Sequence, residues 1–224
     1  MGRLTVATAA LLAVASLIAG PAWVSASPSR ATVSRCTHGY TYAGLASSGG
    51  VDGVAATITA LRRPSVASGH AAAWVGVGGV HQGVGGASEW LQAGVAAFPR
   101  EGLHLYVEAV SRGDARRFVD LGRAVPGRSY RVQVVETAPD LWQASIDGRV
   151  VGKPAYLPTV GGSWRGVATA ESWAANHASC NGYAYRFKRV SARTGSRWEA
   201  FAGSERVGAA VSRARAGFSA VAYS

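Results

Sequence analysis

Apolar and polar side chains alternate with a period of two along many short runs of this chain, and glycine-rich turns separate the runs. Because successive side chains of a β-strand point to opposite faces, such runs predict strands with one buried face. The clearest pair is Leu141–Ile146 and Arg149–Val151, since the Asp147-Gly148 between them tolerates the positive φ angles of a type I′ hairpin turn. Only Glu205–Arg215 favours a short helix, so we expect an all-β sandwich of antiparallel sheets. The other expected strands are 54–61, 74–77, 90–95, 103–110, 130–136, 167–173, 182–190 and 218–223.

The N-terminus has the three parts of a secretory signal peptide. Arg3 is positively charged, Leu4–Gly20 is apolar, and Val24-Ser25-Ala26 has the small residues of a cleavage site. An uncleaved membrane anchor is disfavoured because no basic stop sequence follows the apolar run. We therefore expect residues 1–26 to be a signal peptide and 27–224 to be one secreted domain, which has no membrane association after the signal is removed.

The two cysteines, Cys36 and Cys180, stand at opposite ends of the expected mature chain. In an oxidising compartment such a pair is expected to form a disulfide. A catalytic thiol would need a base partner, and no sequence motif pairs either cysteine with one, so a structural role is favoured.

The composition disfavours several other kinds of site. The formal net charge is +11, but the arginines are dispersed and accompany no recognised nucleic-acid-binding motif, so no nucleic acid partner is expected. The five histidines lack spacings such as His-x-x-x-His, and we expect neither a metal nor another cofactor. The serine-hydrolase motif Gly-x-Ser-x-Gly does not occur. A monomer is expected.

Strand parity divides the central runs into an apolar face and an aromatic one. One face carries Val75 and Val77, then Leu91, Ala93 and Val95, then Leu103, Leu105 and Val107, which suits a shared core. The opposite face carries Trp74, Trp90, Gln92, Tyr106 and Glu108, together with Gly76, Gly78 and Gly94. A solvated strand face ordinarily holds residues such as Thr, Lys and Ser, so tryptophans and glycines there favour a groove for a polymer chain.

Gln92 and Glu171 form a candidate hydrolytic pair, because each shares a strand face with aromatic residues. A carboxyl group can act as base and then as acid, and the ordinary pKa of a glutamate, about 4.3, suits an acidic medium. An amide NH₂ can donate to a developing oxyanion, and its carbonyl can orient a water. The alternative for each residue is an ordinary polar group on a solvated strand face.

Four segments in this order resemble the motifs of the glutamic peptidases, the eqolisin or G1 family. They are Trp74-Val75-Gly76-Val77-Gly78-Gly79, Leu91-Gln92-Ala93-Gly94-Val95, Tyr106-Val107-Glu108 and Ala170-Glu171-Ser172-Trp173. The resemblance implies an acid endopeptidase with a concanavalin-like double antiparallel β-sheet sandwich. It makes Gln92 and Glu171 catalytic, and it places Trp74 and Glu108 in the substrate cleft, to which we add Trp90 and Tyr106. Gly78 stands where the family has an acidic residue.

Two alternatives remain open. One is a non-catalytic secreted sandwich that binds polysaccharide or peptide, and the other is a glycanase that uses Glu108 and Glu171. For the peptidase, a polypeptide is the expected partner. We expect Gln92 and Glu171 to lie on adjacent or facing strands, within hydrogen-bond reach directly or through one water.

Overall fold

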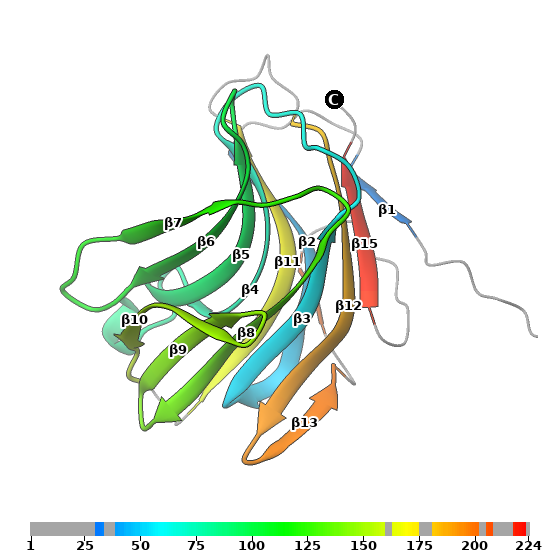
Figure 1. The fold of residues 1–224 in the computed structure, drawn as a ribbon. Coiled ribbons are helices and arrows are strands. Elements are labelled where there is room, and N and C mark those ends of the chain that lie inside the picture. The colour runs from blue at the N-terminus through cyan, green and yellow to red at the C-terminus, as the bar shows by residue number, and fades with distance from the viewer. Residues whose placement is uncertain are drawn as a thin grey trace, which may run out of the picture.

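The strands form two layers packed face to face (Figure 1). The computed structural model describes residues 30–33, 39–159, 163–174, 181–201, 205–207 and 217–222. The seven-stranded layer, called the site sheet, has the order β14 (Glu205–Val207), β2 (Gly39–Val51), β11 (Trp164–Ala174), β4 (His70–Gly79), β5 (Glu89–Phe98), β6 (Gly102–Val110) and β7 (Arg117–Arg123). The eight-stranded layer, called the back sheet, has the order β1 (Arg30–Val33), β15 (Gly217–Ala222), β12 (Tyr183–Thr194), β3 (Gly53–Ala60), β8 (Ser129–Ala138), β9 (Leu141–Ile146) and β10 (Arg149–Tyr156), with β13 (Arg197–Ala200) paired to β12.

Neighbouring strands are antiparallel, except that β1 and β15 pair in parallel. The tight β9–β10 hairpin follows the prediction from Asp-Gly. Both Asp147 (φ 50°) and Gly148 (φ 78°) have positive φ, and Ile146 pairs with Arg149 across the turn. A short 3₁₀ turn, η1 (Val84–Gly86), lies between β4 and β5. The predicted all-β double sandwich is confirmed.

The main core lies between the two sheets, where strand parity places it. Val75, Leu91 and Val107 of the site sheet are buried there with Ile58 and Val132 of the back sheet. A second apolar cluster lies on the other side of the site sheet. It consists of Ala72, Trp74, Ala96 and Tyr106, with Tyr42, Phe98 and Val167 packed against them. The aromatic face that the sequence predicts is therefore itself partly buried.

One predicted element is wrong where it can be examined. Glu205–Val207, expected to begin a helix, is strand β14 and pairs antiparallel with β2; the rest of the segment to Arg215 lies outside the described residues. The edge of β2 offers backbone hydrogen bonds, and this tertiary pairing outweighs a weak helix propensity. Strands β2 and β7 were not expected, because β2 contains the Ser47–Gly50 run and most of β7 is exposed.

The expected signal peptide, residues 1–26, lies outside the described residues, and so do Cys36 and Cys180. Their disulfide therefore stays a prediction. Among the residues that the structure describes, no helix is long and apolar enough to cross a membrane.

Candidate active site

Six residues chosen from the sequence lie on the face of the site sheet that is turned away from the main core, called the site face below. The strand register explains why. Gln92 on β5 pairs with Glu108 on β6, and Glu171 on β11 pairs with Ala72 on β4, two residues before Trp74. Directly paired residues point to the same side of a sheet, as do residues two apart in one strand. The six residues are Trp74, Trp90, Gln92, Tyr106, Glu108 and Glu171.

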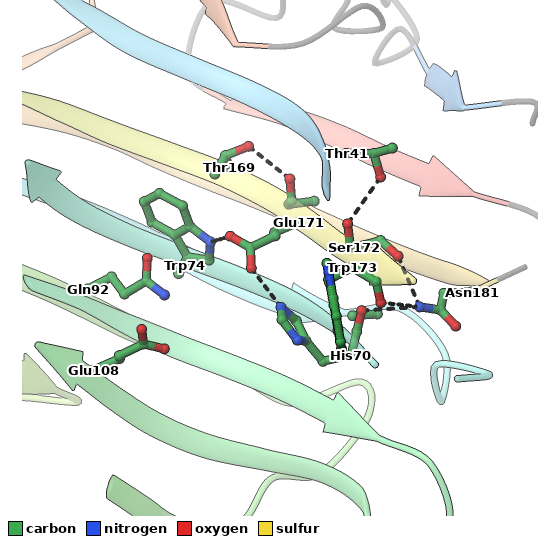
Figure 2. A network of polar contacts seen from close by, with 12 residues as sticks. Thr41, His70, Trp74, Gln92, Glu108, Thr169, Glu171, Ser172, Trp173 and Asn181 are labelled. Atoms are coloured by element: carbon green, nitrogen blue, oxygen red, sulfur yellow. Dashed lines mark hydrogen bonds and ion pairs between the residues drawn. The ribbon is translucent and has the colours of Figure 1, made fainter. Parts of the chain in front are cut away.

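Glu171 is a buried carboxylate held at both oxygens. Trp74 Nε1–H donates to Glu171 Oε2 at 3.0 Å, and His70 Nε2 lies 2.7 Å from Glu171 Oε1. Figure 2 shows the carboxylate between these two rings, which both project from β4. Only 6% of Glu171 is exposed. Trp74 and His70 fix the position of the carboxylate, and each of its oxygens keeps a further lone pair that a water can use.

Gln92 is held by a different partner. Its Nε2–H donates to Tyr106 Oη at 3.3 Å, and the Tyr106 ring stacks on Phe118 at a centroid distance of 5.3 Å. Burial raises the pKa of Tyr106 well above its ordinary value, and the nearby carboxylates of Glu171 and Glu108 act in the same direction. Tyr106 is therefore a neutral phenol. The second amide hydrogen and the amide carbonyl of Gln92 remain for other partners.

The expectation that Gln92 and Glu171 lie on adjacent or facing strands is wrong. Strand β4 lies between β11 and β5, because β4 and β5 form the hairpin whose first strand pairs with β11. Gln92 pairs with Gly76 of β4, and Glu171 pairs with Ala72 of the same strand. Trp74 lies midway between these two positions of β4. Gln92 and Glu171 do not hydrogen-bond to each other directly, and each is fixed by its own aromatic partner.

Glu108 is an ion-pair partner rather than a free acid. Arg116 contacts it twice, with Nε 2.7 Å from Oε1 and a Nη2–H···Oε2 distance of 3.0 Å. Trp90 Nε1–H also donates to Glu108 Oε1, at 3.2 Å. The Arg116 guanidinium also lies close to Tyr40 of β2. Burial raises the pKa of Tyr40, and the Glu171 carboxylate adds to this while Arg116 opposes it. Arg116 thus reaches over the site face from the β6 side to the β2 side.

Sequence reasoning missed His70 and Arg116. Parity could have found His70, because residues 70, 72 and 74 of one strand share a face. The histidine spacing tests His70 only as a metal ligand, and the strand predicted from the sequence begins at Trp74, whereas β4 begins at His70. Arg116 precedes β7 in a turn, where no periodicity marks a side chain that will reach a distant strand. In the described parts of the chain, no group of three or more His, Cys, Asp or Glu residues is placed to hold a metal ion.

No family model matches the chain, and a search of curated proteins finds no relative. Among solved structures, the chain resembles scytalido-glutamic peptidase, solved with a transition state analog inhibitor. The TM-score is 0.58 at 16% sequence identity, over 84% of this chain and 100% of that one. SCP-B, a member of the eqolisin family of peptidases solved with the tripeptide Ala-Ile-His, gives a TM-score of 0.54 at 15% identity with the same coverage. The chain therefore has the fold seen in glutamic peptidases, and its function must be argued from its own site.

Proposed function

We propose that this chain is a secreted acid endopeptidase of the glutamic type. The observation that carries the proposal is the buried carboxylate of Glu171, held by two donors on the same sheet face as Gln92. The fold shared with glutamic peptidases supports it. A buried carboxylate fixed at a defined orientation is what a general base requires, since a misplaced base loses much of its effect.

Glu171 and Gln92 would act on a peptide bond from two sides. Strands β11 and β5 are two strand spacings apart, about 10 Å, and the two residues are also four positions apart along β4, about 13 Å. A water and a peptide carbonyl group can therefore lie between the two side chains, over Trp74. Glu171 takes a proton from the water while the water oxygen attacks the carbonyl carbon. Glu171 later gives that proton to the leaving nitrogen. The Gln92 amide donates to the oxyanion that forms.

The decisive test is hydrolysis of a denatured protein from about pH 2 to about pH 7 by the wild type and by Glu171→Gln. We expect Glu171→Gln to lose about 10²- to 10⁴-fold in kcat, because the amide cannot take up the proton of the water. Glu199→Gln is the matched control, since Glu199 is an exposed carboxylate on β13. Activity that survives in Glu171→Gln would exclude the peptidase mechanism.

A non-catalytic module that binds peptide or polysaccharide is the second candidate. The aromatic site face favours this candidate, because aromatic rings can bind a polymer chain. Arg116, which lies against Glu108 and close to Tyr40, adds a cation at the edge of that face. A wild type that binds a denatured polypeptide without cleaving it would establish this candidate. The glycanase that uses Glu108 and Glu171 is disfavoured, because Glu108 receives three donor contacts, two of them from the cation Arg116, whereas Glu171 has one partner at each oxygen.

A further inference from the structure

His70 lies outside the motifs that resemble glutamic peptidases, yet it makes the shortest contact of Glu171. It is the first residue of β4 and pairs with Trp173, two residues beyond Glu171 on β11. Its Nε2 lies 2.7 Å from Glu171 Oε1. An ionised carboxylate can only accept, so Nε2 carries a proton whenever Glu171 is charged.

The surroundings fix His70 at this place. Gly69 has a φ of 68°, and a Cβ there would meet the Trp173 carbonyl oxygen at 2.1 Å, so only glycine fits the turn that leads into β4. The rings of Tyr40, Phe98 and Trp173 enclose the imidazole, each with its centroid about 6 Å away. Three neighbouring rings and the contact with Glu171 give the imidazole, whose side chain is 15% exposed, a defined orientation toward Glu171 (Figure 2).

Asn181 ties the two strands together behind this contact. Its Nδ2 donates to the His70 carbonyl oxygen at 3.2 Å and to the Trp173 carbonyl oxygen at 3.0 Å. The start of β4 and the end of β11 are therefore joined beyond their ladder hydrogen bonds. This link holds the backbone positions from which His70 and Glu171 meet.

We propose that His70 is a positioning residue that orients the Glu171 carboxylate. The inference rests on the peptidase function proposed above. The Nε2–H fixes Oε1, so the remaining lone pairs of the carboxylate face a fixed direction. The proton taken from water stays on Glu171 until it passes to the leaving nitrogen.

The other charged and titratable groups that face His70 do not hold Glu171 Oε1 in its place. From β2 the phenol of Tyr40 faces the ring, and from β11 Glu171 is the carboxylate in contact. The rings of Phe98 on β5 and Trp173 on β11 carry no charge. Beyond Tyr40, the guanidinium of Arg116 is paired with Glu108.

Two substitutions test the hydrogen bond. His70→Phe keeps a ring among its aromatic neighbours and removes the donor, so we expect kcat to fall about a hundredfold with KM unchanged. His70→Gln keeps an N–H donor, so it should recover part of the kcat that His70→Phe loses. His104→Gln is the control. It removes a histidine–carboxylate pair, His104 with Asp120 at 2.9 Å, on β6 and β7 of the same sheet.

A second measurement does not depend on activity. In ¹H–¹⁵N spectra of the wild type, the imidazole Nε2–H of His70 should give a downfield signal that exchanges slowly with water, and Glu171→Gln should change it. If the wild type is active and His70→Phe keeps the same kcat and KM, the role of His70 alone is overturned. Absence of the protected signal from the folded wild type would also overturn it. A wild type that shows the signal but cleaves nothing would overturn the peptidase function, and with it the catalytic role of His70.

Discussion

At the scale of single residues, Arg116 has the widest reach over the site face. Its side chain is 54% exposed, while its partner Glu108 is 3% exposed. The guanidinium contacts Glu108 on β6 and lies close to Tyr40 on β2, two strands that are separated in the sheet by β11, β4 and β5. A polypeptide that lies across Trp74 must therefore pass beneath this side chain or displace it from Tyr40.

Arg116→Ala leaves the buried Glu108 carboxylate with Trp90 as its remaining donor. An undercompensated buried charge is costly, and we expect the free energy of unfolding at neutral pH to fall by about 1–3 kcal/mol. Urea denaturation measures this loss. Adding Glu108→Gln should restore part of the stability, because the charge that lacks a partner is then removed. Equal stability of wild type and Arg116→Ala would show that solvent compensates Glu108.

At the scale of strands, parity predicts which face each side chain occupies, and it does so well here. It separates Leu91 from Gln92 and Val107 from Glu108, because the period of two is a local property of the backbone. Which strands become neighbours depends on pairing between distant segments, so the position of β4 between β11 and β5 could not be predicted. For the same reason, the approach of Arg116 to Tyr40 could not be predicted from the sequence.

The β4–β5 pairing depends on a close approach at Gly94, which pairs with Trp74. A Cβ at Gly94 would meet the Ala73 carbonyl oxygen at 2.0 Å. Gly94→Ala should therefore push the two strands apart, cost about 1–3 kcal/mol in unfolding free energy, and lower kcat by moving Trp74 relative to Gln92. Gly49→Ala on β2 is the matched control, because a Cβ there meets nothing within 4 Å. A thermal midpoint of Gly94→Ala equal to that of Gly49→Ala would contradict the close approach.

At the scale of the whole molecule, tyrosine phenols are buried in both apolar layers. Tyr183 and Tyr185 on β12 lie in the main core, while Tyr106 lies in the second cluster on the site face. Burial raises the pKa of Tyr183 to about 12, and it raises the pKa of Tyr185 further. Because a phenolate in an apolar layer is poorly solvated, folding opposes ionisation at each of these positions.

Because folding opposes the ionisation of these tyrosines, the free energy of unfolding should fall at alkaline pH. A tyrosine whose pKa is raised in the folded state keeps its proton where the unfolded chain has lost it, so its contribution is complete below about pH 10 and is lost as the pH rises toward its folded-state pKa. Between about pH 10 and about pH 12, Tyr106, Tyr183 and Tyr185 should each lower the unfolding free energy by about 1.4 kcal/mol per pH unit. Urea midpoints at stepped pH measure the fall. The tyrosinate absorbance of these buried residues should appear together with the loss of β-sheet circular dichroism. Tyrosinate formation by every tyrosine near pH 10, in a molecule that stays folded, would contradict the burial of these phenols.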